Sequence, residues 1–212
     1  MAIILTESNA LFLHIPKTGG QFVEAALRKL GIAHRWANAP GADKRHADWA
    51  YVRDENPDFA FAFVRDPWSR LVSAYLGKSL EEGGLFSGTT FRQFVAAIAG
   101  GARNKHWLPM CEFLGKVEWN HVWRVSEMHT WLAHLGQRFG YEGPVPEYNA
   151  TRYAMTAVIT QCVADWPPER LRLLEEKPCV ADFYDRQLSD QVRALYAEDL
   201  RRFGFQWVEA VA

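Results

Sequence analysis

Residues 11–20 constrain the fold more than any other stretch, because they join a buried strand to the start of a helix. Residues 11–15 are almost entirely apolar, which is typical of a strand covered on both faces of a parallel sheet. Gly19 and Gly20 lack a Cβ, so backbone N–H groups there can approach a ligand closely. The helix that follows adds unpaired N–H groups and the positive end of its dipole. Together with Lys17, the stretch predicts a site for a phosphate-sized anion.

A second apolar run, residues 59–64, predicts another central strand, and it ends at Arg65. Asp66 and Pro67 then indicate a helix, with Asp66 as N-cap and Pro67 at the first helical position. Strands that alternate with helices predict an α/β fold with a mostly parallel central sheet flanked by helices. In such sheets ligands bind at the carboxyl ends of the strands. If the two strands are neighbours, Lys17 and Arg65 face one crevice.

Apolar spacing and capping residues predict the other elements. Short strands are expected at residues 32–37 and 121–125, and residues 102–115 are expected to be irregular. Ser126 is expected to cap a helix that ends near residue 139, and Ser189 one that ends near residue 203. Residues 152–163 fit a helix or a strand. Further helices are expected over residues 20–30, 47–54, 91–98 and 167–176.

Length and charge limit the class of protein. A chain of 212 residues is expected to form a single domain, residues 1–212. The net charge is −1, from 24 basic and 25 acidic residues without a basic run, so nucleic acid is not an expected partner. Three widely spaced cysteines and the lack of any run of 18 apolar residues predict a cytoplasmic chain without a membrane span. The histidines share no ligand spacing, so no metal is expected.

The lysine precedes the glycines here, whereas the Walker A pattern places it after them. The loop is therefore expected to hold a smaller anion or to approach it differently, and an ordinary strand-to-helix turn is the alternative. A second anion contact is predicted at Arg65 and Ser73. Ser73 lies ~9 Å along a helix from Pro67, and both side chains could reach one phosphate. The alternative is that Arg65 pairs with a carboxylate and Ser73 is a small core residue.

Four motifs resemble those of the sulfotransferases that use PAPS, 3′-phosphoadenosine 5′-phosphosulfate. The two long ones are Pro16-Lys17-Thr18-Gly19-Gly20 and Phe63-Val64-Arg65-Asp66-Pro67-Trp68-Ser69-Arg70-Leu71-Val72-Ser73-Ala74-Tyr75. The two supporting ones are His106-Trp107-x-Pro109 and Leu195-Tyr196-x-x-Asp199-x-x-x-Phe203-Gly204-Phe205. Within that family the chain resembles the carbohydrate sulfotransferases, which include the chondroitin enzymes and many bacterial homologues.

The resemblance implies a fold related to the P-loop nucleotide kinases and a set of ligand contacts. It implies that the 3′-phosphate is held by Arg65 and Ser73. It implies that the 5′-phosphosulfate is held by Lys17, Thr18, Gly19 and Gly20. Gln21 stands where the family usually has Thr, and its amide could still donate to a phosphate oxygen.

The expected reaction moves a sulfuryl group in line from a phosphate oxygen to a hydroxyl. As in phosphoryl transfer, the protein mainly positions the partners and stabilises charge. Lys17 is expected to meet the charge that grows on the leaving oxygen. His46, at the start of a short helix as in bacterial relatives, is the expected base, and His106 is the alternative. A solvated loop histidine is the other interpretation of His46, and His14 is expected to be a core residue.

We therefore expect a PAPS-dependent sulfotransferase whose acceptor is a hydroxyl of a small molecule or saccharide, with PAP as the second product. A nucleotide kinase or NTPase and a non-catalytic PAP-binding module are the alternatives. Trp68 and Trp107 are candidates for stacking on adenine or a sugar, although core burial is the more common role of such residues. The oligomeric state is left open.

Overall fold

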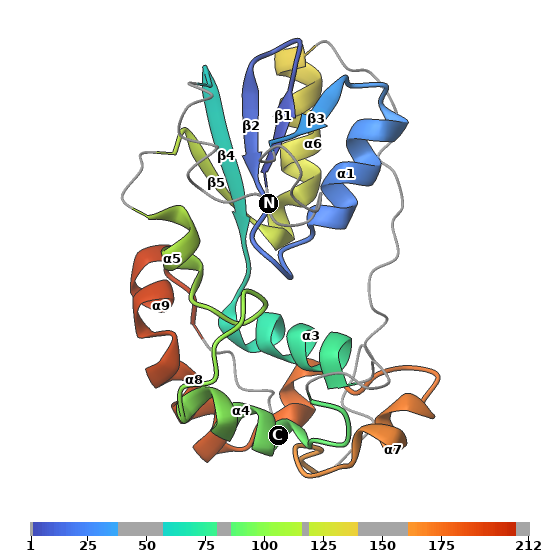
Figure 1. Cartoon of the computed structure of the whole chain (residues 1–212), viewed down its shortest axis with the longest axis vertical. Coiled ribbons are helices and arrows are strands. Elements are labelled where there is room, and N and C mark those ends of the chain that lie inside the picture. Colours follow the sequence, from blue (N-terminus) through green and yellow to red (C-terminus); the bar gives the residue numbers. More distant parts are fainter. Residues whose placement is uncertain (1, 38–56, 80–85, 116–118, 140–160, 207–212) are drawn as a thin grey trace. The chain divides into compact units, whose positions relative to one another are not determined.

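The computed structural model describes residues 2–37, 57–79, 86–115, 119–139 and 161–206 (Figure 1). The chain forms two compact units. One comprises Met1–Arg65 with Glu112–Asn149, and the other comprises Asp66–Cys111 with Ala150–Ala212. The single domain expected over residues 1–212 stays a prediction.

The first unit contains a five-stranded sheet in the order β3-β1-β2-β4-β5 (Figure 1). The pairs β2–β4 and β4–β5 are parallel, whereas β1 is antiparallel to both β2 and β3. Four of these strands therefore run in one direction, and the predicted mostly parallel sheet is confirmed. The strands are β1 (Ala2–Leu5), β2 (Ala10–Leu13), β3 (His34–Trp36), β4 (Phe59–Val64) and β5 (His121–Arg124).

Strand β1 was not expected from the sequence. It pairs with β2 as a hairpin, from Ala2 opposite Leu13 to Leu5 opposite Ala10. Asn9 turns the chain with a φ of 43°, a left-handed conformation that asparagine tolerates better than most residues. The four residues of β1 are all buried, so they show no alternation by which a strand could be recognised.

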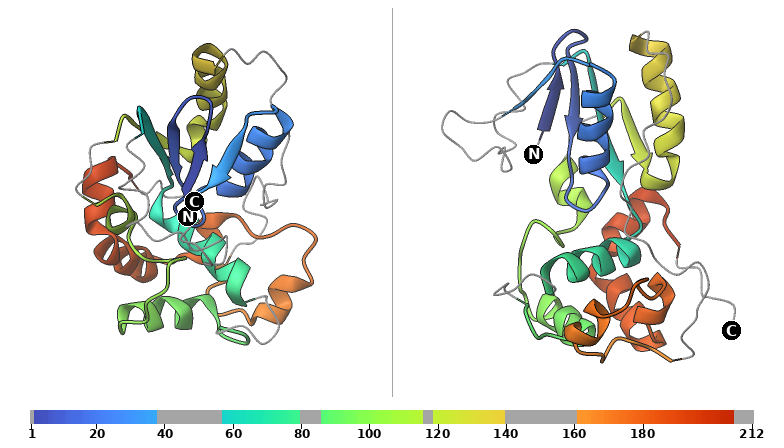
Figure 2. Two further views of the ribbon diagram at one scale, coloured as in Figure 1. Left: turned by 45° about the horizontal axis from the view of Figure 1, so that its top comes forward. Right: turned by 90° about the vertical axis from the view of Figure 1, so that its right-hand side faces the viewer.

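Helices α1 (Gly20–Lys29) and α6 (Met128–Phe139) pack on one face of this sheet (Figure 2). Their apolar sides share a core with Phe12, Phe61 and Phe63 from β2 and β4. Burial of each such aromatic side chain contributes about 1.5–3 kcal/mol. On the outer side of α1, Arg28 pairs with Glu24 at 2.5 Å.

The second unit is helical. Its core joins Tyr75, Phe91, Phe94, Phe183 and Leu188. Asp66 caps α3 as predicted, because its Oδ1 accepts a hydrogen bond from the Ser69 N–H at 2.8 Å. The helices are α3 (Pro67–Ser79), α4 (Phe91–Ala99), α5 (Met110–Leu114, which crosses into the first unit), α7 (Pro168–Arg172), α8 (Arg186–Leu195) and α9 (Ala197–Phe203).

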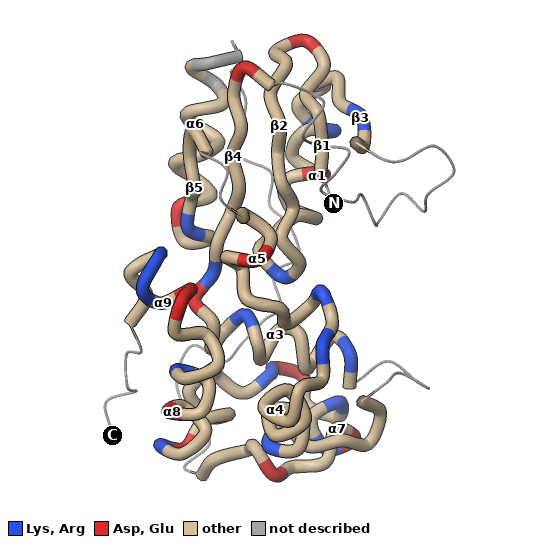
Figure 3. The backbone as a smooth tube through the Cα atoms, turned by 60° about the vertical axis from the view of Figure 1, so that its left-hand side comes forward, with Lys and Arg blue, Asp and Glu red and all other residues tan. Residues whose placement is uncertain are grey.

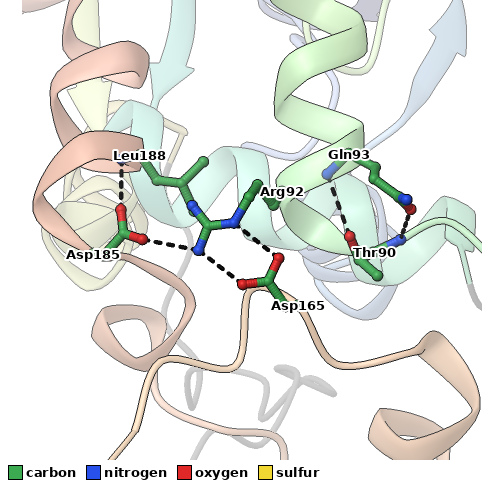
Figure 4. Close-up of polar contacts among 6 residues, drawn as sticks. All are labelled: Thr90, Arg92, Gln93, Asp165, Asp185 and Leu188. Atoms are coloured by element: carbon green, nitrogen blue, oxygen red, sulfur yellow. Dashed lines mark hydrogen bonds and ion pairs between the residues drawn. The ribbon is translucent and has the colours of Figure 1, made fainter.

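Arg92 on α4 ties three segments of this unit together (Figure 4). Its guanidinium donates to both carboxylate oxygens of Asp165, at 2.8 and 2.9 Å, and to Asp185 at 2.8 Å. The bonds to Asp165 raise the pKa of Arg92 above its ordinary value. Asp185 in turn caps α8 by accepting the Leu188 N–H. Next to this network, Thr90 and Gln93 form a reciprocal capping box at the start of α4.

Several predicted boundaries are wrong. Ser189 lies inside α8, and Asp185 is its cap. The helix expected to run to residue 203 is two helices that meet at Tyr196. Helix α5 occupies part of the stretch expected to be irregular. The 3₁₀ turn η2 (Val125–Glu127) precedes α6, so Ser126 is not its cap. The helix expected at residues 47–54 lies outside the described residues, as does most of the stretch at 152–163 that fitted a helix or a strand.

Candidate functional site

The loop of residues 14–19, called the β2–α1 loop below, joins the end of β2 to the start of α1. Thr18 closes a turn in it: its N–H and its hydroxyl both donate to the Ile15 carbonyl, at 3.4 and 2.8 Å. Thr18 is fully buried. Its hydroxyl therefore helps to hold the loop in shape.

Two residues of the loop have left-handed backbone. The φ angle is 70° at Lys17 and 83° at Gly19. Glycine adopts this conformation without a steric penalty, whereas a lysine in it costs about 1–2 kcal/mol. Strain of this kind concentrates at ligand-binding loops, where the surrounding structure enforces it. Half-buried Lys17 is therefore held in place by the fold.

The first turn of α1 is suited to an anion. Gly19, its N-cap, has no side chain to bond the first N–H groups, and the first turn contains no acidic residue. The helical hydrogen bonds begin with the Val23 N–H, which donates to the Gly19 carbonyl at 3.2 Å. Arg28 and Lys29 stand in the last turn, so the charge pattern follows the helix dipole. Gln21 is exposed at the second position of the helix.

Arg65 directly follows β4, the strand next to β2. Because the two strands are parallel, with Leu13 opposite Ala62, their carboxyl ends lie at the same edge. The Arg65 Nη1 is 3.5 Å from the Lys17 carbonyl oxygen, a long hydrogen bond. The structure thus confirms that β2 and β4 are neighbours and brings Arg65 to the backbone of the β2–α1 loop, and the convergence of the two cations on one crevice stays a prediction.

Ser73 lies on α3, in the second unit, and is half-buried. It stands one turn after Ser69, whose N–H and hydroxyl bond the capping carboxylate of Asp66. The core side of α3 carries Leu71 and Tyr75 instead. Ser73 is therefore outside the buried side of its helix, and its contact with a 3′-phosphate stays a prediction.

The two candidate bases differ in what the structure describes. His46 lies outside the described residues, so its role stays a prediction. His106 is described and half-buried, and its backbone N–H donates to the Asn104 side-chain oxygen at 3.1 Å. His14, expected to be a core residue, is 8% exposed at the end of β2.

The segment of residues 106–111 is held at four backbone positions. Arg70 Nη1 donates to the Leu108 carbonyl at 2.8 Å, and the Tyr196 hydroxyl donates to the Trp107 carbonyl at 2.6 Å. The Asp199 carboxylate accepts the N–H groups of the two residues that end the segment, Met110 and Cys111, each at 2.8 Å.

All three anchoring side chains of this segment are buried. Burial also raises the pKa of the Tyr196 hydroxyl, which keeps it a donor. The resemblance marked Tyr196 and Asp199 as motif residues without assigning them a role. Arg70 likewise stands in the motif of residues 63–75 without an assigned role, and its contact with the Leu108 carbonyl, 38 residues away, has no local sequence signal. The two supporting motifs, far apart in the sequence, are thus one hydrogen-bonded structure.

Trp68 and Trp107 belong to the core of the second unit. They are 1% and 3% exposed. The Trp68 Nε1 donates to the Ser189 carbonyl at 3.4 Å, and Trp107 makes edge contacts with Phe86 and Phe94. Stacking of either ring on adenine or a sugar was an open expectation, and such burial favours the core role for both.

The part of the chain that the structure describes offers neither a metal cluster nor a membrane span. In this part of the chain no group of three or more His, Cys, Asp or Glu side chains is placed to hold a metal ion. None of its helices combines the length and apolarity needed to cross a membrane.

Comparison with known proteins gives one match. A family model described as "Sulfotransferase family" matches residues 1–206, which is almost the whole chain and includes both units. Searches of curated proteins and of solved structures return no match.

Proposed function

The chain belongs to the sulfotransferase family, and from that premise we propose that it transfers a sulfuryl group from PAPS to an acceptor hydroxyl and releases PAP. One observation carries the proposal. The parallel neighbours β2 and β4 end at the same edge, where Lys17, Arg65 and the start of α1 together offer positive charge and N–H donors. Such an arrangement suits a ligand with several phosphate-type groups.

The 5′-phosphosulfate is assigned to the β2–α1 loop. The Lys17 ammonium and the backbone N–H groups of Gly19 and Gly20 would hold it, with Thr18 maintaining the turn. Gln21 is exposed beside them and can add an amide donor in place of the hydroxyl usual in the family. The 3′-phosphate is assigned to Arg65 and Ser73, following the motif that contains both.

In the proposed reaction the acceptor oxygen attacks sulfur in line as the bond from sulfur to the phosphate oxygen breaks. Negative charge develops on that leaving oxygen, and Lys17 stabilises it or donates a proton to it. A histidine accepts the proton of the acceptor hydroxyl. We assign this role to His46, with His106 as the alternative.

We propose a carbohydrate as acceptor, on the resemblance of the motifs at residues 106–109 and 195–205 to the carbohydrate branch. Hydroxyl groups on other small molecules are the broader class. The cytoplasm as the site of the reaction remains a prediction of the cysteine pattern.

A titration followed by a transfer assay tests the proposal. Calorimetry with PAP and with ATP separates a sulfotransferase from a nucleotide kinase, and we expect PAP to bind at least tenfold more tightly because its 3′-phosphate has partners. Labelled PAPS is then incubated with a panel of saccharides and other alcohols. Tight binding of PAP without transfer to any acceptor would support a non-catalytic module, and preference for ATP would contradict the proposal.

A further inference from the structure

Gly19, at the end of the β2–α1 loop, and Gly20, the first residue of α1, each lie against a side chain. A Cβ added at Gly20 would lie 2.0, 2.1 and 2.4 Å from the Cδ2, Nε2 and Cγ atoms of His14. A Cβ added at Gly19 would lie 1.9 Å from the Cε of Met128, the first residue of α6. The loop backbone is therefore in direct contact with a histidine ring and a methionine.

The His14 ring has little freedom to move away. It is 8% exposed and stacks on Phe12, two residues earlier on β2, with ring centroids 6.1 Å apart and planes at 21°. Phe12 itself stacks on Phe61 and is fully buried. A rigid ring supported by the core cannot give way as the end of a flexible side chain can.

The two glycines differ in backbone conformation, so the reason why a side chain is excluded differs between the two positions. Gly19 has a φ of 83°, so any side chain there is strained whatever space surrounds it. Gly20 starts α1 with a φ outside the left-handed range, so its backbone suits alanine. At Gly20 the steric obstacle to a side chain is the His14 ring.

We infer that His14 is a positioning residue of the loop: its ring fixes the first residue of α1, and it makes glycine necessary at position 20. The close approach of this glycine to the ring, rather than to a ligand, then explains the missing side chain. The inference rests on the proposed function for its ligand, because the loop positioned is the one assigned to the 5′-phosphosulfate.

A double-mutant cycle tests the inference. Gly20→Ala is expected to weaken PAP binding about tenfold or more and to lower the melting temperature by about 2–4 °C or more, as overpacking does. His14→Ala removes the ring. The double variant His14→Ala/Gly20→Ala is then compared with His14→Ala. Its PAP affinity is expected to be less than threefold lower, and its melting temperature is expected to be the same.

The other glycine provides a matched control. Met128→Ala removes the obstacle at Gly19 but leaves its φ of 83°. Gly19→Ala is therefore expected to remain damaging in the Met128→Ala background, because the backbone strain persists. Leu27→Val, on the buried face of α1, lowers stability without touching the glycines, and its PAP affinity is expected to stay within twofold of the parent.

Three results would overturn the inference: a harmless Gly20→Ala, an equal loss with and without the His14 ring, or a loss in Leu27→Val as large as in Gly20→Ala. If His14→Ala does not fold, His14→Ser and its pair with Gly20→Ala repeat the cycle. The melting temperatures are measured without nucleotide. If the parent fails to bind PAP, the proposed function fails, while the cycle in melting temperature still decides whether His14 positions Gly20.

Discussion

Lys17 is unlike a surface lysine. It is half-buried, its backbone is left-handed with a φ of 70°, and its carbonyl accepts the long hydrogen bond from Arg65. The fold thus holds its backbone in one place, although a lysine side chain normally retains considerable rotamer freedom.

Lys17→Ala is expected to lower the rate of sulfuryl transfer about 100-fold or more at saturating PAPS, because the leaving oxygen loses its cation. The rate is measured by mass spectrometry of the sulfated acceptor. Lys29→Ala, at the other end of α1, is the control and should retain the parent rate. Transfer by Lys17→Ala at the parent rate would remove Lys17 from the catalytic role.

Arg65→Ala is expected to weaken binding of the nucleotide, whereas Lys17→Ala is expected to lower the rate of transfer. A charged hydrogen bond to a phosphate contributes about 1.5–3 kcal/mol, so PAP affinity is expected to fall about tenfold or more while turnover at saturating PAPS changes little. Calorimetry with PAP measures the loss, and Arg65→Lys should recover part of it. An unchanged affinity would show that the 3′-phosphate is bound elsewhere.

The base can be identified by comparing two histidines. His46→Ala is expected to lower turnover about 100-fold, the usual scale of general-base catalysis, with PAP affinity retained. His106→Ala is expected to have the smaller effect. Turnover measured for both variants decides between them, and a greater loss in His106→Ala would move the base to His106.

At the scale of elements, the segment of residues 106–111 depends on α3, α8 and α9. Arg70 on α3, Tyr196 at the junction of α8 and α9, and Asp199 on α9 bond its backbone, and all three are buried. Irregular backbone can be buried only when its polar groups have partners. The C-terminal motif is therefore required for the packing of the earlier one.

Asp199→Asn is expected to lower the free energy of unfolding by about 1–3 kcal/mol, because an amide presents one acceptor oxygen to the two N–H groups of Met110 and Cys111. Chemical denaturation measures the change. Asp190→Asn is the control: Asp190 pairs with Arg193 on the surface of α8, and its loss should cost less than about 1 kcal/mol. Equal stability of the two variants would contradict the structural role of Asp199.

Elements were predictable where their signals are local. β2 and β4 follow from their apolar runs, and α1 follows from the helical spacing of its apolar residues. Asp66 was predictable as a cap because it directly precedes Pro67 at the end of a strand. β1 and the break between α8 and α9 were missed. The first is a four-residue run without periodicity, and the second lies at Tyr196, whose side chain bonds Trp107, 89 residues away.

At the scale of the whole molecule, a net charge of −1 gives no general attraction for an anion. Along α8 and α9, arginines are interspersed with Asp and Glu (Figure 3). Several of these charges form short-range pairs, such as Arg201 with Glu198. The proposed affinity for PAPS must therefore come from the local site, and binding there should stabilise the folded chain.

PAP at 100 times its dissociation constant is expected to add about 2.7 kcal/mol of stability and to raise the melting temperature by about 5–10 °C. A thermal shift series over PAP concentration measures it, with ATP as the comparison. The double variant Lys17→Ala/Arg65→Ala should lose most of the shift. A shift that survives in this variant would indicate that PAP binds at another site.

The sequence by itself determined the two buried strands, the residue types that follow them and the family, because apolar runs, caps and motifs are properties of neighbouring residues. Only the tertiary structure decided that β2 and β4 are adjacent and that Arg65 reaches the Lys17 carbonyl. It also placed the His14 ring against Gly20. These relations depend on how strands pair and side chains pack across the fold, and local spacing carries no information about either.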